Sequence, residues 1–91
     1  MKISEVTVKD LQEYLRVDEE IGLSSMLLGA KEYIKGYTGL SEEQLDEHED
    51  LTIALYVLVG DMYDNRQYSV NNYNVNQLVL NTLSMHSINL L

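Results

Sequence analysis

Apolar residues recur at helical spacing near the start of the chain. Val8, Leu11 and Leu15 follow one another at intervals of three and four residues, which is the repeat of one face of an α-helix. The segment opens on Thr7-Val8-Lys9-Asp10, where a hydroxyl and an acid three residues later form a capping-box pattern. The sequence therefore predicts a short helix that begins after Thr7 and has a narrow apolar face.

A second and longer apolar stripe follows with the same repeat, formed by Leu23, Leu27, Ala30, Ile34 and Tyr37. Asp18-Glu19-Glu20 precedes it, and we expect these acids to lie at the positive end of the helix dipole. Gly36 and Gly39 flank its last residue, and a glycine just past an apolar stripe is the usual left-handed stop of a helix. The pattern predicts an amphipathic helix that ends between Gly36 and Gly39.

An acidic segment separates this helix from the most apolar part of the chain. Ser41-Glu42-Glu43-Gln44 is a second capping-box pattern, and residues 42–50 contain six carboxylates and no basic residue. The segment is either a short turn of its own or the first turns of a long helix. From Leu51 to Tyr63 apolar residues occupy nearly every face, as expected of a helix surrounded by others, although a buried strand also fits this run. Its length and its acidic start favour a central helix.

The last third of the chain predicts a loop and a short helix. Residues 65–76 are rich in asparagine, contain no acid and have the composition of a surface loop. Residues 85–91 either continue the last helix, add a short strand against a neighbour, or form a tail that is flexible or orders on a partner. The apolar stripe of the last helix consists of Val75, Leu78, Val79, Thr82 and Leu83. Together the segments predict an all-α fold, a small bundle of four to five helices around a central apolar helix, in a single domain of residues 1–91.

Composition and charge narrow the function classes. The chain has 91 residues, 45% of them apolar, and no cysteine, which predicts a folded core without disulfides or cysteine-ligated metals. Fifteen acids against six bases give a formal net charge of -9, whereas nonspecific binding to phosphates needs clustered positive charge. The opening MKISEVTVKD lacks the apolar run of a secretory signal, and the longest apolar run, 53–59, is too short to span a membrane. We expect a cytoplasmic protein without membrane association.

The sequence contains no arrangement typical of an enzyme. His48 lies among the acids of 46–50, but a transition-metal site usually needs a second imidazole converging on the same point, and no calcium-loop array is present. His86 has Ser84 and Ser87 nearby without the glycine-framed elbow of a serine nucleophile. The five glycines are scattered and form no phosphate-binding loop. We therefore expect no catalytic residue, no cofactor and no metal, and interpret His48 as part of a solvated acidic helix start.

Tyrosines and one arginine are the candidates for a contact surface. Tyrosine suits surfaces that are partly apolar and partly wet, and the chain has seven. The tyrosines at positions 33, 37, 56 and 63 fall within predicted helices and are expected in or around the core. The tyrosines at positions 68 and 73 fit an interface and a place within the domain equally well. Arg66 either stabilises the end of the central helix, with Asp61 or Asp64 as partner, or pairs with the acidic segment of a neighbouring subunit. The candidate interface residues are Tyr63, Arg66, Tyr68 and Tyr73.

Three blocks of sequence occur in a characteristic order within residues 5–68. Asp10-Leu11-Gln12-Glu13-Tyr14-Leu15-Arg16 forms the first helix, the second helix ends with AKEYIKGYTG at residues 30–39, and Met62-Tyr63-Asp64-Asn65-Arg66 ends the apolar one. In order and spacing the blocks resemble the head-tail connector, or head-completion adaptor, proteins of tailed double-stranded DNA phages and prophages, which are small helical proteins. Beyond Tyr68 the resemblance fades, because the loop lacks the proline or glycine that those proteins often carry before the last helix.

This resemblance implies a structural role in a virion. Such proteins form a ring, commonly dodecameric, beneath the portal protein after DNA packaging, and offer a surface to stopper and tail-completion proteins. It implies a homo-oligomeric ring at the head-tail junction, assembled in the host cytoplasm from chains that either oligomerise alone or stay monomeric until the portal templates the ring. DNA would pass through without specific binding, because an acidic channel wall repels phosphates. The candidate acids for that lumen, or for an interface, are Glu42, Glu43, Asp46, Glu47, Glu49 and Asp50.

A second function class also fits the negative charge. An acidic inhibitor that mimics DNA would occupy a nucleic-acid-binding enzyme, but it needs acids spread over a folded face at phosphate-like spacing. Here the acids cluster at two helix starts. The sequence therefore favours a structural adaptor over a DNA mimic or another small protein-interaction module, and any of these over an enzyme.

Overall fold

The computed structural model describes residues 1–18, 22–66, 70 and 75–87. Within these ranges the chain forms no strand, so the predicted all-α class is confirmed. The elements are a 3-10 helix, η1 (Ile3–Glu5), and five α-helices, α1 (Val8–Leu15), α2 (Leu23–Thr38), α3 (Glu42–Asp46), α4 (Glu49–Asp64) and α5 (Gln77–His86). No helix in the described part of the chain has the length and apolar character needed to cross a membrane.

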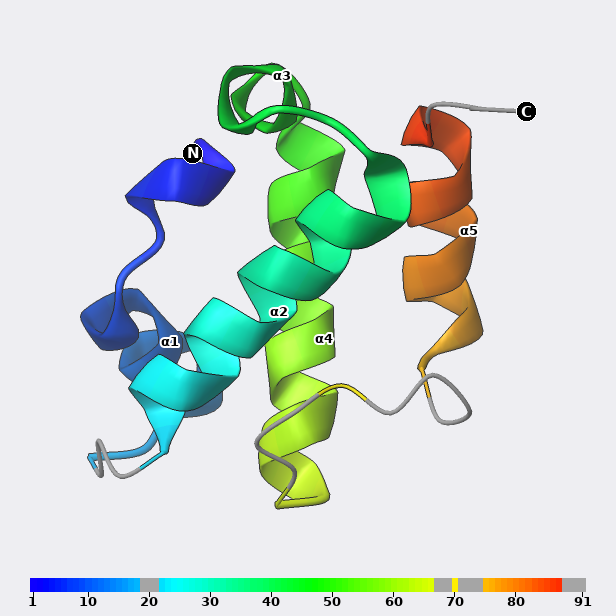
Figure 1. The fold of residues 1–91 in the computed structure, drawn as a ribbon. Helices are drawn as coiled ribbons and strands as arrows, with labels where there is room; N and C mark the ends of the chain where they lie inside the picture. Colours follow the sequence, from blue (N-terminus) through cyan, green and yellow to red (C-terminus); the bar gives the residue numbers. More distant parts are fainter. Residues whose placement is uncertain (19–21, 67–69, 71–74, 88–91) are drawn as a thin grey trace.

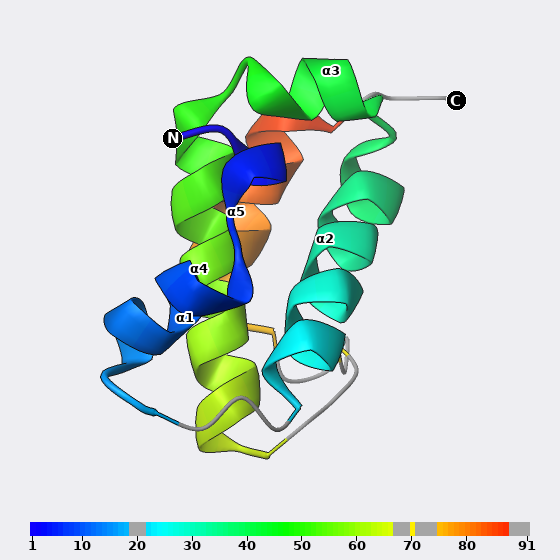
Figure 2. The same ribbon diagram turned by 90° about the vertical axis from the view of Figure 1, so that its left-hand side faces the viewer.

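Helix α4 is the centre of the bundle. It packs against α1, α2, α5 and η1, and Figures 1 and 2 show it running through the molecule with α2 and α5 on different sides. The central helix predicted from the apolar run is confirmed, and the alternative of a buried strand is wrong. One position departs from the pattern, because Ile53 is 64% exposed. The buried apolar residues of α4 are Leu51, Ala54, Leu55, Leu58, Val59 and Met62.

Both predicted capping boxes are present. The Thr7 hydroxyl accepts a hydrogen bond from the Asp10 backbone N–H at 3.3 Å, and the Asp10 carboxylate accepts one from the Thr7 N–H at 2.9 Å. Ser41 and Gln44 exchange the same pair of bonds at 3.2 and 2.9 Å. The second box starts only a short helix, because α3 ends at Asp46 and α4 begins at Glu49. The acidic segment is therefore a helix of its own followed by the first turn of α4.

The two ends of α2 turn out differently from each other. Its end is as predicted, because Gly39 has a φ of 72°, a left-handed conformation that suits glycine, and its N–H donates to the Lys35 carbonyl at 2.9 Å. The start of α2 differs from the prediction, because Gly22 is the N-cap and the first turn contains no acid. Asp18 lies before that turn, where its carbonyl accepts from the Gln12 amide at 2.9 Å, and Glu19 and Glu20 lie outside the described residues. The expectation that these acids interact with the dipole of α2 is wrong for Asp18.

The C-terminal part folds as a helix against α4. Helix α5 continues to His86. Of the alternatives for residues 85–91, the structure therefore supports continuation of the helix for residues 85 and 86. Residues 88–91 lie outside the described residues. The predicted surface loop at 65–76 is described only in part, and there Val70 and Val75 are partly buried against the core. These two valines attach the connection to the bundle.

Candidate functional site

The acidic segment and Arg66 lie at opposite ends of the molecule. Helix α3 and the start of α4 are at one end in both Figure 1 and Figure 2, and the end of α4 is at the other. Helix α4 has 16 residues, which corresponds to about 24 Å at about 1.5 Å per residue. Arg66 therefore cannot reach residues 42–50 of its own chain, and an ion pair between the two would have to join different copies.

Asp46 attaches α3 to the N-terminal turn of the chain. Its carboxylate accepts hydrogen bonds from the Ser4 hydroxyl at 2.7 Å and from the Ser4 backbone N–H at 3.0 Å. These two bonds lower the pKa of the Asp46 carboxyl below its usual value. The interaction joins residues 42 positions apart, so this predicted lumen residue has a role within the subunit.

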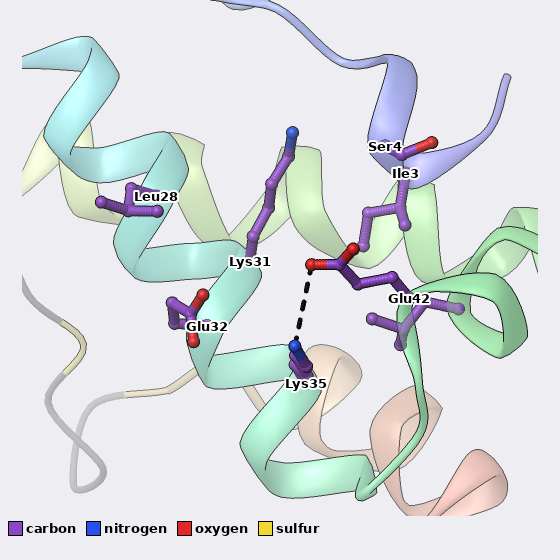
Figure 3. Close-up of a pocket in the computed structure, with 8 residues that line it drawn as sticks. Ile3, Ser4, Leu28, Lys31, Glu32, Lys35 and Glu42 are labelled. Carbon is purple, nitrogen blue, oxygen red and sulfur yellow. Dashed lines mark ion pairs between the residues drawn. The ribbon is translucent and has the colours of Figure 1, made fainter.

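A cleft of about 290 Å³ lies between η1, α2 and α3 (Figure 3). Ile3, Leu28 and Leu45 line it together with charged side chains. Lys35 Nζ lies 3.7 Å from Glu42 Oε1, the contact drawn in Figure 3, and Lys31 Nζ, on the same helix, donates to the Val6 carbonyl at 3.2 Å. The two lysine contacts thus connect α2 to α3 and to the residue after η1, across a cleft that is lined by both apolar and charged side chains.

Asp50 contacts the end of the chain's last helix. Its Oδ2 lies 2.7 Å from His86 Nε2, and this hydrogen bond lowers the pKa of the Asp50 carboxyl against the opposing effect of burial. The ring of His48, the N-cap residue of α4, lies beside that of His86, with centroids 4.1 Å apart. This cluster was not predicted from the sequence, because His86 is 36 residues from Asp50 and no local pattern connects them.

Four acids of the segment are exposed, Glu42 at its contact with Lys35 and three others. Glu43 lies on α3, Glu47 between the two helices, and Glu49 in the first turn of α4. Glu49 precedes the exposed Ile53 by four residues, and residues at this spacing lie on the same face of a helix. An acid and an apolar side chain are thus presented together on the surface of α4.

The end of α4 places Arg66 in a defined position. Asn65 is the C-cap, and its backbone N–H and side-chain amide both donate to the Asp61 carbonyl, at 3.1 and 2.9 Å. Arg66 follows with a φ of 53°, a left-handed conformation that is uncommon for residues other than glycine. Its guanidinium carbon lies 4.7 Å from the centroid of the Tyr63 ring, within the range of a cation–π interaction. Tyr63 and Arg66 therefore form one aromatic and cationic unit.

The tyrosines expected at the core divide into two groups. Tyr33, Tyr56 and Tyr63 are partly buried against the core, and burial raises the pKa of the first two hydroxyls. Tyr37 is exposed at the rim, where its hydroxyl lies 3.0 Å from the Ser84 hydroxyl. The candidate interface residues Tyr68 and Tyr73 lie outside the described residues.

An apolar groove between α4 and α5 was not anticipated from the sequence. It is lined by Ile53 and Val57 of α4 and by Leu78 and Val79 of α5, with Asp50 at its edge. Ile53 and Leu78 are both more than half exposed. Large exposed apolar side chains that gather in one place mark contact surfaces in small proteins. The groove is thus the apolar part of the candidate site.

In comparisons with known proteins, no family model, curated protein or solved structure matches the chain.

Proposed function

We propose that this chain is a head-tail connector adaptor, a structural virion protein that forms a ring beneath a portal protein and carries stopper or tail-completion proteins. The role is assembly and not catalysis. The resemblance noted in the sequence supports it, because the three blocks fall on α1, the end of α2 and the end of α4. Each block therefore lies in a helix or at its end, as expected for a small helical adaptor.

The observation that carries the proposal is the separation of the acidic segment from Arg66 by the length of α4. A subunit with complementary features at two different places associates head to tail, and such contacts close into a ring when the rotation is right. A self-complementary dimer would instead need one patch that matches itself. The geometry of this subunit therefore favours a ring.

The proposed contact places the Tyr63–Arg66 unit of one copy against the α4–α5 groove of the next. The groove offers apolar side chains from Ile53 and Leu78, and Glu49 lies on the same face of α4 as Ile53. An aromatic ring next to a guanidinium matches an apolar surface next to a carboxylate in both polarity and charge. The occupant of the groove is thus proposed to be a second copy of this chain.

The remaining exposed acids suit the wall of a channel. Glu43 and Glu47 lie at the same end of the subunit, and a negative wall lets DNA slide because it repels the phosphates. A DNA mimic is less well supported. Asp46 and Asp50 hydrogen-bond to side chains of their own chain, so these two are not freely presented to an enzyme, and Glu42 is partly neutralised by Lys35.

Deletion of the gene from the phage or prophage that encodes the chain tests the proposed role. We expect heads that package DNA but lack tails, because the portal would have no adaptor on which tail-completion proteins dock. Electron microscopy of the lysate distinguishes tailless heads from complete particles, and the gene supplied from a plasmid should restore tails. Tailed, infectious particles at normal yield without the gene would refute the adaptor role.

A further inference from the structure

We propose that His48, Asp50 and His86 form a binding site for a divalent transition-metal ion of the zinc class. The inference does not depend on the proposed function, since it concerns chemistry within one subunit. The sequence alone predicts no metal, because His48 has no second imidazole near it along the chain. The fold supplies one, because it brings His86 from the end of α5 to the start of α4.

The ligand atoms are close enough to converge on one ion. One nitrogen or carboxylate oxygen from each of the three residues lies within 4.8 Å of the other two. In a tetrahedral zinc site, ligand atoms about 2.0 to 2.2 Å from the metal lie about 3.3 to 3.6 Å from one another. The 2.7 Å contact between Asp50 and His86 would open by less than about 1 Å to reach that spacing. A separation as wide as 4.8 Å would close by about 1.2 to 1.5 Å, and side-chain rotations allow both changes because all three residues are only partly buried.

The charge around the cluster favours a cation. Residues 42–50 contain six carboxylates and no basic residue, and the formal net charge of the chain is -9. His86 is the last residue of α5, where the negative end of the helix dipole stabilises positive charge. His48, at the start of α4, has the opposite dipole, but Glu49 and Asp50 lie in that first turn and offset it.

The ligand types identify the class of metal. Two imidazoles and one carboxylate suit Zn²⁺, Co²⁺ or Ni²⁺, whereas Mg²⁺ and Ca²⁺ prefer sites made of oxygen atoms alone. Three protein ligands leave a further coordination position for water or for a group from a partner. Bound metal would also join the end of α5 to the α3–α4 junction. At a zinc concentration of 100 times the Kd we expect the unfolding midpoint to rise by roughly 10 to 20 °C.

Proton NMR of the unmodified chain without an affinity tag tests the site directly. The chain contains two histidines, so the histidine Hε1 signals, which lie apart from the ring signals of the tyrosines, report the two imidazole ligands and nothing else. We expect ZnCl₂ to shift the signals of both rings and the change to be complete at one equivalent. Unchanged rings, a shift of only one ring, or changes that continue well past one equivalent would overturn the proposal. This measurement needs no substitution and does not depend on the folding of a variant.

Calorimetric titration of variants with ZnCl₂ tests the ligand set. His48→Gln, His86→Gln and Asp50→Asn should each weaken binding by at least about tenfold. Glu43→Gln is the matched control, because it removes the same charge as Asp50→Asn from the same acidic segment but lies outside the cluster. It should bind zinc as the parent chain does. Equal losses in Asp50→Asn and Glu43→Gln would show a general attraction to acids and overturn the site.

Discussion

Replacing Leu55 with alanine is expected to lower the free energy of unfolding by about 2 to 5 kcal/mol. Leu55 lies in α4 and is completely buried, so the truncation removes apolar contacts and leaves a cavity where the helices of the bundle meet. A chain of 91 residues has a total stability of only about 5 to 14 kcal/mol. The substitution would therefore remove a large fraction of it, and urea unfolding followed by circular dichroism measures the change.

Ile53→Ala is the matched control for this prediction. Isoleucine and leucine have the same number of carbon atoms, and Ile53 lies on the same helix two residues away but is 64% exposed. We expect its truncation to change the free energy of unfolding by no more than about 0.5 kcal/mol. Similar losses from both substitutions would mean that α4 is not buried on one side and exposed on the other as described.

Arg66→Glu is expected to abolish ring formation on the portal while leaving the isolated subunit folded. The substitution reverses the charge at the end of α4 and removes the guanidinium that lies over Tyr63. In the proposed contact it places a carboxylate against Glu49 of the next copy, and like charges at an interface cost several kcal/mol. The loss repeats at every contact of a ring, so the whole assembly is sensitive. Sedimentation with purified portal rings measures the bound chains, and circular dichroism checks the fold.

Two further variants make this test specific. Lys9→Glu changes the net charge by the same amount at an exposed position on α1, a helix that contributes no residue to either proposed contact surface, and should still form rings. Glu49→Arg combined with Arg66→Glu exchanges the two charges and should restore assembly at least in part. If Lys9→Glu also failed to form rings, the loss in Arg66→Glu would be an effect of net charge and not of the proposed contact. Rings formed normally by Arg66→Glu alone would exclude the proposed contact.

The local features of the fold were predictable from the sequence because short-range interactions determine them. The capping boxes at Thr7 and Ser41 need only a hydroxyl and an acceptor three residues later, and Gly39 needs only its own conformational freedom. Asp18 was misassigned to the dipole of α2, because that helix starts only after its N-cap residue, Gly22. The spacing of apolar residues located α4 but not its exposed side, because nearly every face of that helix is apolar in sequence.

The features that depend on tertiary packing could not be predicted. The Ser4–Asp46 interaction joins residues 42 positions apart, and the cluster of His48, Asp50 and His86 requires α5 to return along α4 to the α3–α4 junction. The groove exists only where Ile53 and Leu78 meet across two helices. The placement of residues 42–50 and Arg66 at opposite ends of the molecule could not be predicted either. In the sequence, residues 42–50 could equally form a turn that folds back along α4.

The mass of the protein in solution, alone and mixed with portal rings from the same source, tests the central claim most directly. Light scattering should give the mass of one chain, 10.4 kDa, for the protein alone. After mixing, the mass of the portal ring should increase by a whole-number multiple of 10.4 kDa that matches the symmetry of the ring. An unchanged portal mass in the presence of excess monomer would contradict the adaptor role.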